Sequence, residues 1–261
     1  MLSSASGAPK RIVSLAPDIT ETLFALNTGH LIVGTAEQSD YPAAAAKILT
    51  IGSFVQPHTE QILKLHPDLI LCRKEATSSF LLAWLKKIKI PYLVLPGSNE
   101  KDIFKTIEIL GRRLNRPAIA LKLVRSLRRQ LRHIRKLGGR TPTLLIQIEE
   151  NPLMIAGKNT LPHRAIELAG GRNAGSNYSG YPKLQRETLL ALNPDIILLP
   201  VSPKEKEKKE KWLNSWKRWG SLSAVKKNSL YTIDADLLSR ASPRFIEGVK
   251  TLSLLLHQHD F

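Results

Sequence analysis

The sequence predicts an α/β protein made of two similar lobes, each a parallel sheet covered by helices, with one long helix between them. A helix-to-strand unit occurs twice: EQILKLHPDLILC runs from Glu60 to Cys72, and ETLLALNPDIILLP runs from Glu187 to Pro200. Each copy is a short amphipathic helix that begins with Glu, stops at a His/Asn-Pro-Asp turn and leads directly into an aliphatic strand. Two lobes of similar construction usually hold a ligand in the cleft between them.

Strands and helices alternate through the first half of the chain, which is the pattern of a parallel sheet covered on both faces. The first helix follows Ala16, and Asp18 or Thr20 is expected to cap it. Residues 10–116 form the predicted N-terminal lobe. Its other expected segments are the strands 11–15, 31–35, 69–72 and 92–95 and the helices 17–26, 78–88 and 99–114.

One long helix is predicted between the two halves. Residues 117–137 contain no break, Pro117 lies in the first turn, and Gly138-Gly139 follow the end. Apolar residues recur near helical spacing, and at ~1.5 Å per residue the helix would span roughly 30 Å. We therefore expect residues 117–139 to connect the lobes. The opposite face is basic, and its members are Lys122, Arg125, Arg128, Arg129, Arg132, Arg135 and Lys136.

The second half, residues 140–261, repeats the alternation and forms the predicted C-terminal lobe. It is expected to contain the strands 143–148 and 230–233, the helices 161–169 and 243–257, and a charged helix within residues 204–220. No Gly/Ser-rich or Pro-rich linker separates the halves. The lobes are therefore expected to be hinged stiffly on the long helix.

The composition is that of an ordinary globular protein, apart from its charge. Of the 261 residues 43% are hydrophobic, and no apolar run approaches the ~18 residues of a membrane span. The first residues, MLSSASGAPK, contain no continuous apolar region, so we expect either a cytoplasmic protein or one whose export signal has been removed. The single cysteine, Cys72, excludes an internal disulfide and is expected to be a small buried hydrophobe.

The formal net charge of +17 fits binding to nucleic acid, binding to an anionic membrane surface, or a basic solvated surface. Much of this charge lies in residues 112–140 and 204–218. The second stretch alternates in sign, and Trp212, Trp216 and Trp219 follow helical spacing, which favours packing on the lobe over base stacking. Because no helix-turn-helix, zinc-finger or RNA-recognition signature accompanies the charge, no nucleic-acid partner is expected.

The motifs of common catalytic sites do not occur in the sequence. HExxH, the P-loop, GxGxxG and GxSxG are missing, and the seven histidines are scattered without metal-ligand spacing. We therefore predict no enzymatic activity, no catalytic residue, no metal site and no cofactor.

Several segments together resemble one protein family. They are RIVSLAPDITETLFAL, SDYP, EQILKLHPDLIL, ENPLMIAGKNTLPHRAIELAGGRN and LSRASPRFIEGV, and in this order they cover the chain from about Arg11 to the last helix. The sequence is similar to the cluster A (type III) periplasmic binding proteins, which supply ABC importers with vitamin B12, haem and iron siderophores. Residues 239–244, SRASPR, look most like the vitamin B12-binding members.

The resemblance implies the helical-backbone, TroA-like fold: two Rossmann-like lobes joined by a single long helix, with a shallow cleft that closes little on binding. It implies a periplasmic substrate-binding protein, its export signal presumed removed, that captures cobalamin or a related corrinoid. The ligand would pass to the permease dimer of an ABC importer in the inner membrane. A ferric siderophore or a haem-type ligand is the alternative. A monomer is expected.

Ligand-contacting residues are implied by positions that match the family. Tyr41, in SDYP, is expected to pack on the ligand, or else to be a turn tyrosine. Arg244 is expected to donate to the ligand's amides or phosphate, or else to be satisfied by a carboxylate such as Asp236. Asp236 itself matches a family aspartate, with a loop-capping role as the alternative.

Other matching positions carry changed residues. Phe54 and Tyr181 stand where vitamin B12-binding members have tryptophan, and Met154 replaces a phenylalanine; each can still cover an apolar face. Arg73 replaces another tryptophan and loses a stacking plane, although a guanidinium group can stack or bind acidic groups. Each of these residues is as consistent with a core or rim position as with a ligand contact.

The segment IGSFVQPH, residues 51–58, bears on the alternative ligands. Haem-binding relatives place a tyrosine ligand near this segment, which contains none, so haem ligation there is not expected. His58 is expected to be a surface histidine rather than a metal ligand. An anionic ferric siderophore would suit Arg73, Arg244 and the excess positive charge.

Glu60 and Glu187 open the equivalent helices of the two repeat copies. In the family such a pair, one on each lobe, docks into arginine pockets of the two permease subunits. Two exposed carboxylates at a fixed separation would recognise a twofold-symmetric partner by geometry. The alternative is that each Glu favours the helix dipole at a helix start.

Overall fold

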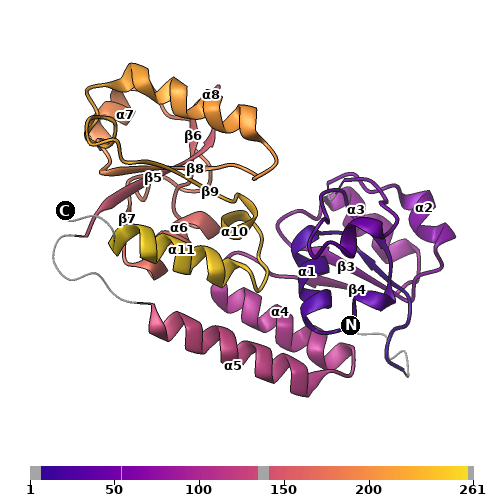
Figure 1. Cartoon of the computed structure of the whole chain (residues 1–261). Helices are drawn as coiled ribbons and strands as arrows, with labels where there is room; N and C mark the ends of the chain where they lie inside the picture. Colours follow the sequence, from indigo (N-terminus) through magenta and orange to yellow (C-terminus); the bar gives the residue numbers. More distant parts are fainter. Residues whose placement is uncertain (1–6, 54, 135–140, 258–261) are drawn as a thin grey trace. The chain divides into compact units, whose positions relative to one another are not determined.

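The computed structural model describes residues 7–53, 55–134 and 141–257, and the chain divides into two compact units (Figure 1). The first unit is residues 1–127 with 241–243, and the second is residues 128–240 with 244–261. The predicted connecting helix is therefore shared between the units rather than separate from both. The short segment Ala241–Pro243 belongs to the first unit although it lies late in the sequence.

The first unit contains a parallel sheet in the order β2-β1-β3-β4. Its elements agree closely with the predicted segments. They are β1 Ile12–Ser14, α1 Pro17–Ala25, η1 Gly29–Leu31, β2 Ile32–Thr35, η2 Ala45–Lys47, α2 Thr59–Lys64, β3 Leu69–Arg73, α3 Ser79–Lys87, β4 Tyr92–Leu95 and α4 Glu100–Arg113.

One core of the first unit lies between the sheet and helices α2 and α3. Ile62 of α2 and Leu85 of α3 pack there on Val13 of β1 and on Ile70 and Cys72 of β3. Burial raises the pKa of the Cys72 thiol to about 12. Cys72 is thus the small buried hydrophobe that the sequence predicted, and it is protonated at neutral pH.

The start of α1 differs from the prediction. Its N-cap is Ala16, whose side chain cannot accept a hydrogen bond, and Pro17 occupies the first helical position. Asp18 and Thr20 both lie inside the helix. The Thr20 hydroxyl is 2.9 Å from Ser14 Oγ and 3.2 Å from the Ala16 carbonyl oxygen. The expected capping role was wrong, because both side chains are used for contacts with neighbouring segments.

The second unit contains a mixed sheet in the order β6-β5-β8-β9, with β7 also paired to β5. The pairs of β5 with β8 and β7 and of β8 with β9 are parallel, whereas β6 is antiparallel to β5. The elements are β5 Thr143–Glu149, β6 Met154–Ile155, α6 Leu161–Ala169, β7 Arg172–Asn173, α7 Arg186–Leu192, β8 Ile196–Pro200, α8 Lys206–Trp216, η3 Lys217–Trp219, α9 Ser223–Lys226, β9 Leu230–Ile233, α10 Asp236–Ser239 and α11 Phe245–His257.

Helices cover both faces of this second sheet. In Figure 1, α7 and α8 lie on one face, and α6, α10 and α11 lie on the other. Trp212 and Trp216 of α8 are 2% exposed, and Trp216 Nε1 donates to Gln147 Oε1 at 2.7 Å. Trp219 packs on the same cluster. The tryptophans therefore pack on their own unit, as predicted. The short elements β6, β7, α9 and α10 were not predicted.

The long helix α5 runs from Pro117 to His133. Val124 and Leu127 are buried, whereas Leu121, on the predicted apolar stripe, is 48% exposed. The last three residues predicted for this helix, 135–137, and the Gly138-Gly139 stop lie outside the described residues.

The two repeat copies adopt the same local structure. His66 and Asn193 end the two helices with left-handed backbone angles, φ 45° and φ 35°. Asp68, two residues later, accepts hydrogen bonds from the backbone N–H groups of Lys10 and Arg11, immediately before β1. Its counterpart Asp195 accepts from the N–H and hydroxyl groups of Thr143 at the start of β5. In both units this aspartate holds the beginning of the neighbouring parallel strand.

Candidate functional site

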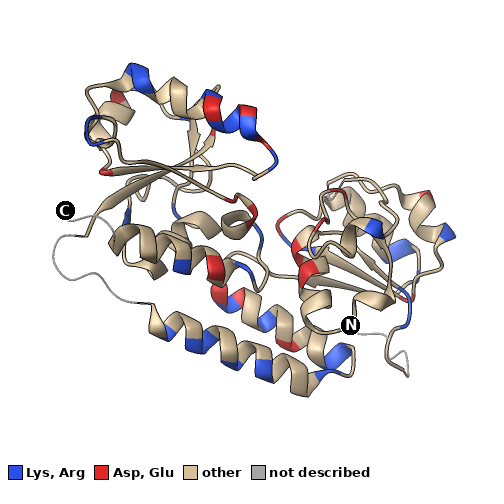
Figure 2. Cartoon of the chain, in the orientation of Figure 1, with Lys and Arg blue, Asp and Glu red and all other residues tan. Residues whose placement is uncertain are grey.

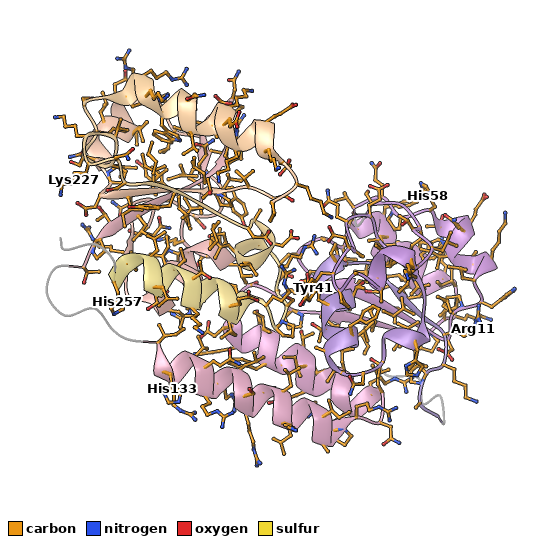
Figure 3. The ribbon with its side chains drawn as sticks, viewed as in Figure 1. Arg11, Tyr41, His58, His133, Lys227 and His257 are labelled. Atoms are coloured by element: carbon orange, nitrogen blue, oxygen red, sulfur yellow. The ribbon has the colours of Figure 1, made fainter. Side chains whose placement is uncertain are left out.

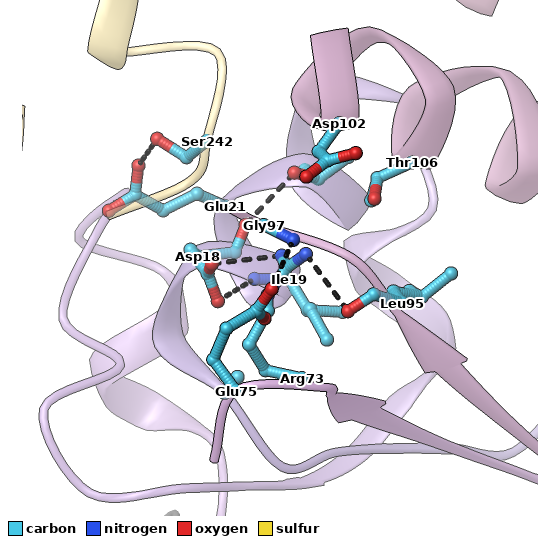
Figure 4. Close-up of polar contacts among 12 residues, drawn as sticks. Asp18, Ile19, Glu21, Arg73, Glu75, Leu95, Gly97, Asp102, Thr106 and Ser242 are labelled. Atoms are coloured by element: carbon cyan, nitrogen blue, oxygen red, sulfur yellow. Dashed lines mark hydrogen bonds and ion pairs between the residues drawn. The ribbon is translucent and has the colours of Figure 1, made fainter. Parts of the chain in front are cut away.

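The carboxyl ends of parallel strands are the usual place for ligand-binding groups in open α/β sheets, and Arg73 is the last residue of β3. Its side chain is 7% exposed, and its Nη2 lies 2.8 Å from Asp18 Oδ2 at the start of α1 (Figure 4). Nη1 donates to the carbonyl oxygens of Leu95, the last residue of β4, and of Pro96, which follows it. A residue predicted to contact ligand is thus buried and engaged with its own unit.

Further polar contacts hold residues 96–98 beside Arg73. Glu75 Oε1 accepts from Gly97 N at 3.2 Å and from Ser98 Oγ at 2.7 Å. A Cβ atom on Gly97 would lie 2.8 Å from Arg73 Cδ, so the close packing needs glycine there. We call Asp18, Arg73, Glu75 and residues 95–98 the arginine cluster; together they fix the loop after β4 (Figure 4).

The returning segment Ala241–Pro243 is tied to the same unit. Ser242 Oγ donates to Glu21 Oε2 at 2.6 Å, and both residues are buried (Figure 4). A hydrogen bond to a buried carboxylate is stronger than one between neutral groups. The predicted SRASPR motif therefore divides: Ala241 to Pro243 belong to the first unit, and Arg240 and Arg244 belong to the second.

Tyr41 and His58 lie on loops of the first unit (Figure 3). Tyr41 is 46% exposed, so its ring is available to a ligand. His58 is exposed, and its Nδ1 is 3.4 Å from Gln61 Oε1. Phe54, the other aromatic residue predicted here, lies outside the described residues.

In the second unit each predicted polar site residue is matched by an opposite charge. Arg244 Nη2 lies 3.3 Å from Asp234 Oδ2, and Arg240 Nη2 lies 2.9 Å from Asp236 Oδ2. A neighbouring carboxylate was foreseen for Arg244, and Asp234 lies at this distance. Asp236 is the first residue of α10.

Met154 and Tyr181 are brought together on adjacent backbone segments of the second unit. Ile155 N donates to the Pro182 carbonyl oxygen at 3.1 Å, and Met154 pairs with Lys183 in an isolated bridge. Tyr181 is 47% exposed, and partial burial raises the pKa of its phenol, which keeps the hydroxyl protonated at neutral pH. The thioether and the aromatic ring therefore belong to one surface region.

Glu60 and Glu187 are both exposed in the first turns of α2 and α7. Each is the second residue of its helix, and each precedes by two positions a fully buried aliphatic residue, Ile62 or Leu189. The equivalent register predicted from the sequence is therefore present in the structure. Among residues 7–53, 55–134 and 141–257, no group of three or more His, Cys, Asp or Glu side chains is arranged to hold a metal ion.

Sequence reasoning missed the aspartates that accompany the arginines. Asp18 and Asp234 each lie within a few residues of the carboxyl end of a strand, β1 or β9. That position is a usable signal, because side chains at the carboxyl edge of a parallel sheet converge. With Asp236 they place one carboxylate beside each of the three guanidinium groups, so the arginine charge in the candidate site is compensated.

Two curated relatives are similar to almost the whole chain. The chain is 28% identical over 265 residues to the uncharacterized ABC transporter substrate-binding lipoprotein YvrC of Bacillus subtilis, covering 97% of this chain and 82% of that protein. It is 25% identical over 253 residues to the vitamin B12-binding protein of Vibrio parahaemolyticus, covering 95% of this chain and 90% of that protein.

Solved structures of related fold bind different ligands. The vitamin B12-binding protein BtuF of Vibrio cholerae superimposes with a TM-score of 0.81 at 25% identity, covering 96% of this chain and 97% of its own. The haem-binding protein RhuT of Roseiflexus gives a TM-score of 0.86 at 23% identity, covering 97% and 99%. The second likeness shows the fold alone. Together the two confirm the predicted helical-backbone fold.

The sequence matches the family described as periplasmic binding protein over residues 12–237, which is most of its length. Proteins of this family are extracytoplasmic solute-binding components of ABC transporters, some of them lipoproteins, and they are not enzymes. Over the described ranges, no helix is both long and apolar enough to span a membrane. This chain belongs to the periplasmic binding protein family, and it is a substrate-binding protein whose partners are a small-molecule ligand and a membrane permease.

Proposed function

We propose that this protein is periplasmic, that it captures cobalamin or a related corrinoid in the cleft predicted between its lobes, and that it delivers the ligand as a monomer to the permease dimer of an ABC importer. The observation that supports this most directly is the compensation of the site's arginines. Arg73, Arg240 and Arg244 each face an aspartate at 3.3 Å or less.

Compensated arginines suit a ligand without strong net charge. An ion pair presents little field to a third group, so a multiply anionic ligand would gain little from these guanidinium groups. Cobalamin is a large, amide-rimmed corrin whose nucleotide-loop phosphate is balanced by the charge of the cobalt centre. The ion pairs thus disfavour an anionic siderophore, which the arginines and the net positive charge of the sequence had suggested when no counter-charges were considered.

Exposed aromatic side chains and a half-buried methionine suit the faces of a corrin. Tyr41 in one unit and Tyr181 with Met154 in the other offer two ring planes and a pliable thioether. We propose that these three residues, together with Phe54, Asp236 and Arg244, contact the ligand. Arg73 would take part only by exchanging its Asp18 contact for a ligand contact, or by holding the loop after β4.

The proposed ligand is tested by absorption spectroscopy. Purified protein is incubated with cyanocobalamin, desalted and scanned through the visible range, with hemin and a ferric siderophore as parallel samples. We expect corrin absorbance near one equivalent to remain with the protein. If all of the corrin colour is lost while hemin or the ferric siderophore is retained, the alternative ligand class of this family replaces the corrinoid.

Single substitutions test the contribution of each unit to the site. Tyr41→Ala and Tyr181→Ala each remove one ring plane, and we expect each to weaken cyanocobalamin binding by about tenfold, because base or ring stacking contributes about 1–3 kcal/mol. Tyr178→Ala, which removes another exposed tyrosine of the second unit, is the matched control and should leave the dissociation constant unchanged. A loss confined to one unit would contradict a ligand held by both.

We further propose that Glu60 and Glu187 dock on the permease. Glu60→Ala combined with Glu187→Ala should leave ligand affinity intact and abolish uptake in a reconstituted transport assay. Glu207→Ala combined with Glu247→Ala is the control, because these glutamates also lie exposed in the first turns of helices. Uptake that survives the first double substitution would remove the docking assignment.

A further inference from the structure

The basic residues of α5 differ from those of the candidate site. Lys122, Arg125, Arg129 and Arg132 follow the spacing i, i+3, i+7 and i+10, which places them on one face of a continuous helix. All four are exposed. We call these four residues the basic face of α5.

The charge of this face is not compensated locally. The sequence of α5, PAIALKLVRSLRRQLRH, contains no acidic residue. Within the described part of the chain, none of the four side chains of the basic face forms an ion pair. Figure 2 shows Lys and Arg along α5 without Asp or Glu, whereas α8 carries both signs.

Helix packing does not require this arrangement. The buried face of α5 is formed by Ala120, Val124 and Leu127, and the basic face lies away from it. Exposed cations at this spacing repel one another by modest amounts on an isolated helix. Because none of the four side chains has an ion-pair partner in the described part of the chain, this cluster contributes no attractive charge pair to folding, and an external anionic partner would relieve the repulsion.

We propose that the basic face of α5 binds the anionic surface of a lipid bilayer. Four cations over ten residues span ~15 Å of helix, a length over which several lipid headgroups are met at once. Each basic residue near an anionic leaflet raises partitioning about fivefold, so four together give roughly several hundredfold. The family works at a membrane permease, so a bilayer is the polyanion that such a protein meets.

Nucleic acid fits this face less well. Single-stranded nucleic acids are bound by aromatic side chains that stack on bases, and α5 contains no aromatic residue. The tryptophans nearest to a basic stretch are those of α8, and Trp212 and Trp216 are buried in the core of the second unit. The face therefore provides positive charge without stacking groups, which suits the fluid, anionic surface of a lipid bilayer.

Vesicle co-sedimentation tests the proposal. The full chain is mixed with vesicles of phosphatidylcholine, or of phosphatidylcholine with about 30% phosphatidylglycerol, at about 50 mM salt. We expect binding only to the anionic vesicles. The substitutions Lys122→Gln, Arg125→Gln, Arg129→Gln and Arg132→Gln, made together, should lower partitioning by about several hundredfold. Raising the salt to about 300 mM should release the wild-type protein.

The matched control removes four charges that are scattered over the surface. Lys64, Lys101, Lys206 and Lys227 are exposed on different segments, and their joint replacement by Gln changes the net charge equally. We expect this control to lose at most about threefold in partitioning. Equal losses in the two variants would show that net charge acts alone and would overturn the proposal.

Two other results would also overturn it. One is wild-type protein that does not prefer the anionic vesicles, and the other is protein drawn from those vesicles onto duplex DNA at equal phosphate concentration. Circular dichroism checks the fold of each variant. If the fourfold variant does not fold, the double variants Lys122→Gln/Arg125→Gln and Arg129→Gln/Arg132→Gln replace it, each with an expected loss of about twenty-five-fold. None of these residues belongs to the proposed ligand site, so the outcome does not depend on which ligand is bound.

Discussion

The two copies of the helix-to-strand unit use the same aspartate in different surroundings. Asp68 in the first unit accepts from the N–H groups of Lys10 and Arg11, immediately before β1, and Asp195 in the second accepts from the N–H group of Thr143, the first residue of β5. Asp68 is exposed, whereas Asp195 is 4% exposed and also accepts the Thr143 hydroxyl at 2.8 Å. The same aspartate therefore contributes unequally to the free energy of unfolding in the two units, because water can replace a lost hydrogen-bond partner only where the aspartate is exposed to solvent.

The two copies differ in character at the last residue of the strand. Arg73 ends β3 in the first copy, and the corresponding residue at the end of β8 in the second copy is Pro200. Arg73 forms a buried ion pair with Asp18, and Asp18→Asn would leave the guanidinium group buried without its counter-charge. We expect a loss of about 3 kcal/mol in the free energy of unfolding, measured by urea denaturation. The double variant Asp18→Asn/Arg73→Met should recover part of this loss. A double variant as unstable as the sum of the two single changes would contradict a coupled pair.

The aspartates themselves give the next largest effect. Asp195→Ala leaves the buried N–H and hydroxyl groups of Thr143 without an acceptor and should cost about 2–3 kcal/mol in urea unfolding. Asp68→Ala, in the exposed copy, should cost about 1 kcal/mol because water can take its place. Asp195→Asn, which keeps one acceptor oxygen, should fall between them. Equal losses for Asp68→Ala and Asp195→Ala would remove burial as the cause of the difference.

The residues with left-handed backbone angles that follow the two helices, Asn193 and His66, should have smaller effects on the free energy of unfolding. Asn193 tolerates its φ of 35°, and its Oδ1 also accepts from Ser223 N at 2.8 Å, so Asn193→Ala should cost about 1–2 kcal/mol. His66 has φ 45°. His66→Gly should raise the free energy of unfolding by up to about 1 kcal/mol, because glycine adopts this backbone without strain. A destabilising His66→Gly would show that the imidazole makes a contact of its own.

The thiol of Cys72 gives the smallest effect at neutral pH. Its counterpart in the second copy, Leu199, cannot titrate. Since the pKa is raised to about 12, the folded thiol stays protonated while the unfolded thiol ionises near its ordinary pKa of 9.0. The contribution of Cys72 to stability is therefore unchanged below pH 9 and falls between pH 9 and about 12.

The rate of alkylation tests whether the Cys72 thiol is buried and protonated in the folded protein. Native protein should react with iodoacetamide at pH 8 only as fast as it unfolds, because the thiolate is the reactive form. Cys72→Val should abolish the loss of stability above pH 9 that the thiol causes. Rapid labelling of the folded protein would show that Cys72 is accessible.

The repeat made much of the fold predictable. Alternating aliphatic strands and amphipathic helices gave the bounds of β4, α6 and β9 to the residue, because hydrophobic periodicity and flanking Gly, Pro and Asn act locally. The start of α1 was misjudged, since Asp18 looks like a capping residue by sequence and is instead held by Arg73, which lies more than fifty residues later. Short elements such as β6 and α10 depend on partners distant in the sequence and carry little local signal.

The sequence by itself determined the two-lobed α/β class, the family, and the exposed register of Glu60 and Glu187, because these follow from periodicity and from motifs that are contiguous. Only the tertiary structure decided the state of charge of the candidate site. Asp18 and Asp234 lie beside Arg73 and Arg244 there, and no local sequence pattern records that these charges meet, whereas the Arg240–Asp236 pair follows the i, i+4 spacing of a helix. The same physical reason separates the paired Arg73 and Arg244 from the unpaired basic face of α5: Coulomb interactions depend on distance in space and on burial, not on order in the chain.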